Sequence, residues 1–330
     1  MQVEMSLSPS QQRVFSMIEI VGTSNIYLYA DDLKLYQEIN SEESVNSSQS
    51  KLDKMYDWTR YSLLRFHPQK CVVMRLGENT KKLGNINSYY AMDETRVKIV
   101  DTEKDLGIIF DSHMSFDEHI TTVVKKANSI AGMIRRTFVH LDKNMFKTHF
   151  SSMVRPHLEY GAPIWNPHLR KHITTIENVQ RRASRQIPGM SHLSYTQRLK
   201  ILRLPTLSYI RYRGDMLEMY KITHGHYDAD AVEGFLEFRA EQAPSRSFRS
   251  HEFHVKKATC KKDVRRFAFK QRVADQWNNL LKTIVEASTI NTFKNRLDKL
   301  WEQNDVMYDP DIDLFAITSS RRTRYEEIKL

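Results

Sequence analysis

The feature that most constrains the fold is a pair of adjacent aspartates, Asp31 and Asp32, that lies between two short strand-like segments. Residues 26–28 precede the pair and residues 33–36 follow it, and both segments are apolar or aromatic at most positions. Two such runs joined by a short polar turn predict a β-hairpin. Successive strand residues point to opposite faces, so neighbouring carboxylates can approach one metal ion only where the backbone turns sharply. The sequence therefore predicts a hairpin whose tip presents both aspartates.

Paired carboxylates at a hairpin tip are suited to binding magnesium. Mg²⁺ prefers octahedral oxygen ligands and keeps several waters, so it binds one or two protein carboxylates together with substrate phosphates. Two ions roughly 3.5–4 Å apart can stabilise the attacking and leaving oxygens of an in-line displacement. The small Ala30, just before the pair, leaves room for a nucleic acid. Asp-Asp is also a common turn dipeptide, so the tetrapeptide alone leaves a purely structural turn as an alternative.

Further motifs follow the hairpin in a distinctive order. An expected helix reaches Trp58, the loop His67-Pro68-Gln69-Lys70-Cys71 comes next, and a valine-rich strand follows it. The later motifs are KDLGIIFD at residues 104–111, MSFDEHI at 114–120, VRPHLEYGAPIW at 154–165, VQRRA at 179–183 and IPG at 187–189.

Together with Tyr29-Ala30-Asp31-Asp32, this series resembles the reverse transcriptases of non-LTR retrotransposons, especially the jockey-like (LINE-type) elements. The resemblance runs from about residue 25 to residue 301, in order and at the family's spacing. Two positions depart from the family pattern: His67 stands where Asn is usual, and Tyr61-Ser62 replace a position often held by Trp. The resemblance implies the C-terminal half of an RNA-directed DNA polymerase: the end of the palm, the thumb and a C-terminal extension.

The resemblance also implies roles for single residues. Asp31 and Asp32 would hold Mg²⁺ while a primer 3′-OH attacks the α-phosphate of a dNTP. Lys70 would protonate the departing pyrophosphate, although an ordinary surface lysine fits its position equally well. Residues 104–111 resemble the primer-grip hairpin. Contacts to nucleotide or primer would come from Tyr29, Ala30, Leu106 and Gly107. The implied partners are an RNA template, a DNA primer or target DNA, and a dNTP.

A polymerase of this family also uses an aspartate from an earlier palm strand. Residues 1–30 contain no aspartate, and Glu4 and Glu19, their only acids, lie on no convincing strand. We therefore expect this chain to be inactive as a polymerase by itself. The alternative to a polymerase is a catalytically inactive retroelement relic that retains only non-specific nucleic-acid binding. A helical module with a cellular partner is a third possibility, to which no motif points.

The charge of the chain is concentrated in one region. The net charge is +10 and the pI is about 9.4, values typical of proteins that bind phosphate backbones. Residues 125–215 hold 17 Lys and Arg against 4 Asp and Glu, a surplus of +13. Such a surface neutralises phosphates and releases counterions, although a solvated helical surface is the alternative. The residues expected to contact nucleic acid are Lys125, Lys126, Arg135, Arg136, Arg181, Arg182 and Arg185.

Other classes of site have little support. Cys71 and Cys260 lie far apart in the sequence, and the 13 histidines form no metal-spaced cluster with them, so we expect no zinc site. His113 and His119 are expected at the surface.

We predict no membrane helix, because no apolar run reaches about 18–20 residues. Sparse cysteine indicates an intracellular protein of the nucleus or cytoplasm. The oligomeric state stays open.

The expected fold class is α+β: a partial polymerase palm, with a small antiparallel sheet and a helix, followed by a mainly α-helical thumb and C-terminal region. The sequence indicates strands at 71–75, 88–90, 97–100 and 106–110. It indicates helices at 42–64, 116–138, 142–153 with a break at Pro156, 170–186, 194–202, 206–223, 264–277 and 293–303. The expected segments are a disordered 1–19, the palm part 20–112, the basic thumb-like 113–224, the linker 225–262, the C-terminal helices 263–303 and the polar tail 304–330.

Overall fold

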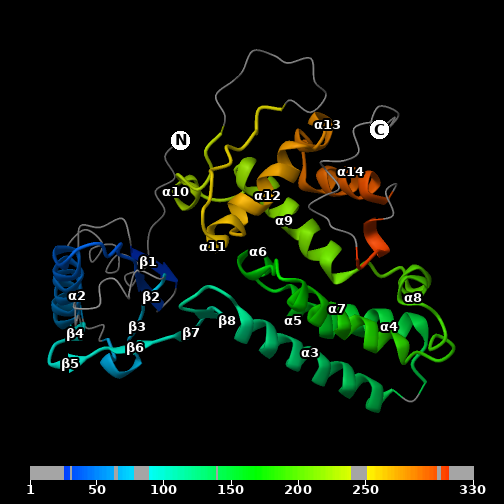
Figure 1. Ribbon diagram of the computed structural model, residues 1–330, viewed down its shortest axis with the longest axis horizontal. Helices are drawn as coiled ribbons and strands as arrows, with labels where there is room; N and C mark the ends of the chain where they lie inside the picture. Colours follow the sequence, from blue (N-terminus) through cyan, green and yellow to red (C-terminus); the bar gives the residue numbers. More distant parts are fainter. Residues whose placement is uncertain are drawn as a thin grey trace. The chain divides into compact units, whose positions relative to one another are not determined.

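The computed structural model describes residues 26–29, 32–62, 66–77, 89–138, 140–238, 251–302 and 306–311 (Figure 1). These residues combine helices with short sheets, as the sequence predicts. They form two compact units. The first contains the described residues up to Asp105 together with Phe110–Met114, and the second contains Leu106–Ile109 and the described residues from Ser115 onward.

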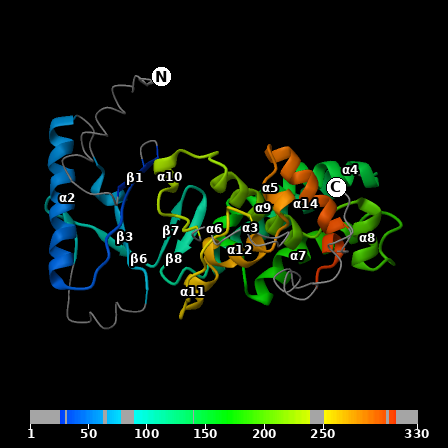
Figure 2. The same cartoon turned by 90° about the horizontal axis from the view of Figure 1, so that it is seen from above.

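The N-terminal unit is built around the predicted hairpin. Strand β1 (Ile26–Tyr29) pairs antiparallel with β2 (Asp32–Leu35). Helix α2 (Glu42–Ser62) lies beside β1 in both views (Figures 1 and 2). Met55 and Trp58 of α2 are buried in one cluster with Ile26 of β1. The part of α2 that carries Met55 and Trp58 therefore covers the hairpin.

The remaining strands of this unit differ from the single antiparallel sheet that we predict. The described strands form four separate two-stranded sheets. One of the four is parallel. In it β3 (Val72–Met74) pairs with β6 (Lys98–Val100), and the chain between them forms a long crossover. The others pair β1 with β2, β4 (Ala91–Met92) with β5 (Thr95–Arg96), and β7 (Thr102–Asp105) with β8 (Ile108–Asp111). The prediction was wrong because parallel pairing depends on where the crossover returns, which the strand pattern does not reveal.

The second unit is almost entirely helical, and most of its helices begin and end near the expected residues. They are α3 (Asp117–Thr137), α4 (Lys143–His149), α5 (Arg155–Glu159), α6 (Ala162–Trp165), α7 (Arg170–Arg185), α8 (Tyr195–Leu202), α9 (Leu207–Thr223), α10 (Ala229–Val232), α11 (Asp263–Arg266), α12 (Phe269–Asn278), α13 (Lys282–Val285) and α14 (Ile290–Glu302). A 3₁₀ turn at Val306–Tyr308 follows α14.

The helix break predicted at Pro156 is wrong. A π-helical turn, Phe150–Val154, joins α4 to α5, and the N–H of Arg155 donates to the carbonyl of Phe150. Pro156 then falls in the first turn of α5, where the missing N–H of a proline costs little. The helical path ends only after Glu159, before Gly161, whose φ of 62° is left-handed.

Helix α9 is the centre of the second unit. It packs against α6, α7, α12 and α14, and its buried side chains occupy more than one face. Trp277 and Trp165 are 0% and 1% exposed, so both side chains serve as packing anchors. None of the helices in the described ranges is both long and apolar enough to cross a membrane.

Part of the predicted linker 225–262 belongs to this core. Val255 is fully buried and forms an isolated bridge with Phe238. The side chain of Asn278 hydrogen-bonds both the N–H and the carbonyl of Val255, each at 2.9 Å. The sequence does not reveal this packing because Val255 meets Phe238 and Asn278, which lie far from it along the chain.

Candidate functional site

The tip of the hairpin carries the predicted magnesium ligands. Tyr29 pairs with Asp32, so only Ala30 and Asp31 lie between the two strands. Ala30 and Asp31 lie outside the described residues, and Asp32 is the one predicted ligand that the structure describes. The Asp32 carboxylate is exposed and forms no ion pair or hydrogen bond with another described residue. It is therefore free to bind a cation.

The two faces of the hairpin differ in character. Leu33 and Leu35 pack with Ile26 against α2. Residues directly opposite across a ladder share a face, so Tyr27 and Tyr29 lie on the other face with Lys34 and Asp32. Tyr27 and Tyr29 are 60% and 65% exposed. Tyr29, a predicted nucleotide or primer contact, is therefore accessible beside Asp32.

Two lysines, Lys34 and Lys70, have to be considered for this site, and they lie at different places in the N-terminal unit. Lys34 forms an ion pair with Asp105 of β7, so its charge is not directed at Asp32. Lys70, the predicted general acid, is exposed on the 3₁₀ turn Pro68–Lys70, next to β5. Within the described part of the chain, no ion pair or hydrogen bond joins the Lys70 ammonium to Asp32. No group of three or more His, Cys, Asp or Glu side chains among the described residues could hold a metal ion.

Leu106 and Gly107, the other predicted primer contacts, form the turn between β7 and β8. Both have positive φ, 44° and 87°, as in the type I′ turns that connect hairpins. The hydroxyl of Tyr160 donates a 2.8 Å hydrogen bond to the carbonyl of Leu106. A Cβ on Gly107 would lie 3.2 Å from the Tyr160 ring, and one on Gly161 would lie 2.6 Å from Cδ1 of Ile108. The turn is thus held by the junction between α5 and α6.

His119 supports the same turn and corrects our expectation that it lies at the surface. It is 2% exposed, and its ring lies 5.0 Å from that of Trp165. The N–H of Ile109 donates to Nδ1 of His119 at 3.3 Å, which leaves the proton of the neutral ring on Nε2. Burial lowers the pKa of His119. The KDLGIIFD, MSFDEHI and EYGAPIW motifs therefore meet in one packed cluster.

The predicted nucleic-acid contacts lie on α3 and α7. These helices run side by side in the same direction. Their first turns lie together, since Asp117 at the start of α3 bonds to Lys171 and His172 at the start of α7. Their last turns, which carry most of the arginines, therefore lie at the same end. The exposed members of the set are Lys125, Lys126, Arg135, Arg136, Arg182 and Arg185. None of these six pairs with a carboxylate among the described residues.

Arg181 differs from its neighbours. It is half-buried, and its guanidinium lies 5.0 Å from the centre of the Tyr195 ring. Arg198 is buried behind it, and its pKa is lowered by burial and by the nearby Arg185 and Arg181. Of the three arginines predicted to contact nucleic acid on α7, Arg182 and Arg185 therefore remain available to a ligand.

A buried polar network, which sequence reasoning missed, underlies the basic surface. The Glu177 carboxylate accepts hydrogen bonds from the Tyr195 hydroxyl at 2.5 Å and from the Leu207 N–H at 3.0 Å. Burial raises the pKa of Glu177. Asp215 is paired with Arg272 at 2.8 Å, and both are almost fully buried. No sequence motif marks either acid.

The burial of these acids does not change the net charge of the exposed side chains between residues 125 and 215. Glu177 and Asp215 are two of the 4 acids between residues 125 and 215, and two of the 17 bases, Arg198 and Arg211, are buried as well. The surplus of +13 therefore belongs to partly or fully exposed side chains.

No protein-family model, curated protein or solved structure matches this chain.

Proposed function

We propose that this chain carries the catalytic turn, the primer-grip-like hairpin and the thumb of a non-LTR retrotransposon reverse transcriptase. Its own activity is salt-dependent binding of nucleic acid by the helical unit. The observation that carries the proposal is the surface of α3 and α7, where six exposed bases have no carboxylate partner among the described residues. Acids in the same stretch are few, and two of the four are buried.

The physical basis is the release of counterions. Each phosphate neutralised by Lys or Arg releases condensed cations, so binding is tight at low salt and weakens as salt is added. Contacts to phosphates carry no sequence information directly. The unpaired bases extend over several turns of α3 and over the last turn of α7, so they provide several contacts of this kind.

In the polymerase that the sequence resembles, Mg²⁺ would supply the charge that stabilises the transferring phosphoryl group. Asp31 and Asp32 would hold that ion. The free Asp32 carboxylate and the exposed Tyr29 beside it support this role. Leu106 and Gly107 would position the primer through the backbone of a turn that Tyr160 holds in place.

The test is to locate a bound RNA–DNA hybrid by amide hydrogen exchange of the full chain at low salt. We expect protection on the exposed faces of α3 and α7, with α13 and α14 unaffected. A hybrid that binds without protecting α3 or α7, or that does not bind at low salt, would contradict the proposal.

A further inference from the structure

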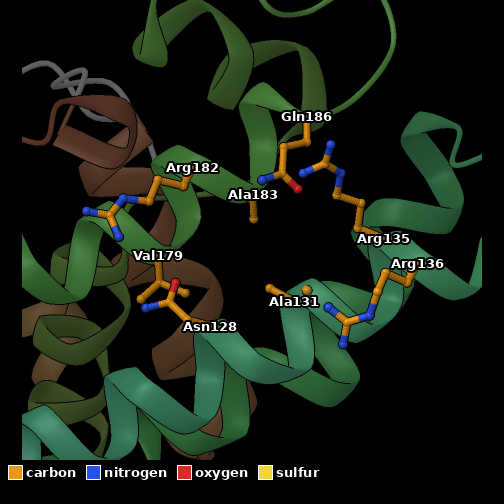
Figure 3. A pocket seen from close by; sticks show the side chains of 9 residues that line it. Asn128, Ala131, Arg135, Arg136, Val179, Arg182, Ala183 and Gln186 are labelled. Carbon is orange, nitrogen blue, oxygen red and sulfur yellow. The ribbon is translucent and has the colours of Figure 1, made fainter.

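A hollow of about 450 Å³ lies between the C-terminal halves of α3 and α7 (Figure 3). Ala131 of α3 and Ala183 of α7 lie on its two sides. Arg182 and Asn128 lie toward one end, and Arg135, Arg136 and Gln186 toward the other. We refer to it as the α3–α7 groove.

Small residues create the groove. Gly132 adjoins Ala131 on α3, and a Cβ on Gly132 would lie 3.4 Å from Nη1 of Arg136, so the guanidinium lies next to this glycine. A glycine inside a helix costs about 0.5–1 kcal/mol relative to alanine. The floor is formed by the apolar side chains of Val179 and Ala183, which are 1% and 6% exposed.

The rim is cationic and has no counter-charge. Arg135, Arg136 and Arg182 form no ion pair or hydrogen bond with another described residue, and no carboxylate lines the groove. Arginines in the last turn of a helix also interact favourably with the helix dipole. This interaction explains why positive side chains stand at these positions. The dipole does not account for a concave, apolar-floored space between them. Low-dielectric walls of one charge sign focus the field on an anion inside.

The size and lining of the groove indicate a small organic anion. Ligand pockets typically span about 300–1,000 Å³ and combine apolar walls with a few polar groups that fix orientation. A nucleotide matches both the rim and the floor of the groove. Guanidinium groups bind its phosphate, and its sugar and base present apolar surface. In a duplex the bases are paired inward, so only a nucleotide with a free base can fill the groove.

We propose that the α3–α7 groove binds one nucleotide of a single-stranded nucleic acid. The arginines hold its phosphate, and its sugar and base lie against Ala131, Val179 and Ala183. This inference rests on the proposed nucleic-acid binding and gives it a preferred substrate, an unpaired strand. A free nucleoside monophosphate carries the same chemical groups as one nucleotide of a strand. The experiment distinguishes between these two ligands.

The decisive variant fills the groove without changing the charge. Ala131→Leu places a larger side chain in the hollow and leaves every arginine of the basic surface in place. Ala231→Leu, at an exposed position of α10, is the matched control. The full-length proteins are titrated at low salt with a ten-nucleotide single strand, the corresponding duplex and deoxyadenosine monophosphate. Circular dichroism checks the fold.

We expect Ala131→Leu to weaken binding of the single strand roughly tenfold, because the apolar surface of one sugar and base then stays in water, and to leave duplex binding unchanged. Ala231→Leu should bind both like the wild type. Binding of the monophosphate that is lost in Ala131→Leu would identify the free nucleotide as the ligand and support the same site.

Unchanged single-strand affinity in a folded Ala131→Leu protein would overturn the groove proposal, and duplex binding that persists would leave the proposed function intact. If Ala131→Leu does not fold, Arg182→Gln replaces it, with Lys54→Gln as its control. Arg182→Gln must then weaken single-strand binding more than duplex binding. An equal loss for both ligands would overturn the proposal.

Discussion

The hydroxyl of Tyr160 donates a hydrogen bond to the carbonyl of Leu106, a residue 54 positions earlier in the chain. The two residues belong to motifs that the sequence singles out separately. Leu106 has a left-handed backbone, with φ of 44°, a conformation that costs a non-glycine residue about 1–2 kcal/mol. The bond from Tyr160 offsets part of this cost and fixes the turn that resembles a primer grip.

This contact predicts a graded effect of two neighbouring substitutions. Tyr160→Phe should lower the free energy of unfolding by about 0.5–1.5 kcal/mol, because one hydrogen bond is lost at a partly exposed position. Gly161→Ala should cost more, since its Cβ would lie 2.6 Å from Ile108 at a φ of 62°. Urea unfolding measures both. A Gly161→Ala protein as stable as Tyr160→Phe would show that the junction is looser than its geometry indicates.

The buried pair of Asp215 and Arg272 predicts strong coupling between two residues. Arg272 donates to both Asp215 oxygens, at 2.8 and 3.1 Å, and to the carbonyl of Pro163. Arg272→Met should destabilise the protein by about 3–5 kcal/mol, because it leaves a buried charge unpaired. Adding Asp215→Leu should recover part of the loss. A double-mutant cycle by urea unfolding tests this, and additive effects would argue against the pairing.

His251 predicts a loss of stability in mild acid. Burial and the adjacent His254 lower the pKa of His251 to about 4, and the carbonyl of Trp277, His224 and Lys282 also face it. Below pH 6.5 the unfolded chain binds a proton that the folded chain does not bind until about pH 4. The free energy of unfolding should therefore fall through this window by on the order of 2–3 kcal/mol.

The measurement compares urea unfolding at pH 7 and pH 4.5 for three proteins. His251→Gln should show a smaller pH dependence than the wild type, because the buried titrating group is gone. His113→Gln, which replaces an exposed histidine, should show the wild-type dependence. Equal pH dependence in all three would mean that other groups cause the acid sensitivity.

Local patterns predicted the elements of the fold well. The hairpin, α2 and the long helices α3, α7 and α9 follow from periodicity and from turn residues. The pairing of β3 with β6 and the π-helical turn before Pro156 did not follow from the sequence. The pairing of β3 with β6 depends on a contact distant in sequence, which periodicity does not encode.

The candidate site was predicted unevenly for the same reason. Composition located the basic helices but could not separate the exposed Arg182 from Arg181, which lies over Tyr195. His119 is indistinguishable from a surface histidine until Ile109 and Trp165 are packed around it. The α3–α7 groove depends on the parallel packing of α3 and α7, for which the sequence has no local signal.

The proposed magnesium site predicts the outcome of a primer-extension assay on this 330-residue chain. Asp31 and Asp32 are the two carboxylates proposed to hold metal, and residues 1–30 add no aspartate, which is too few ligands for a two-metal site. We expect no incorporation of dNTP on an RNA template with a DNA primer, with either Mg²⁺ or Mn²⁺. Incorporation that disappears in the Asp31→Ala, Asp32→Ala double variant would show that another carboxylate completes the site.

The most direct test of nucleic-acid binding is the salt dependence of duplex affinity for the full chain. The logarithm of the association constant should fall linearly with the logarithm of salt concentration, by roughly 0.9 per phosphate contact on B-form DNA. Arg182→Gln with Arg185→Gln should reduce this slope by roughly 1 to 2 and weaken binding alike for unrelated sequences. Lys54→Gln with Lys98→Gln, which removes the same charge from the N-terminal unit, should leave the slope near its wild-type value. A slope unchanged by the arginine pair, or the absence of salt-dependent binding by the folded protein, would contradict the account.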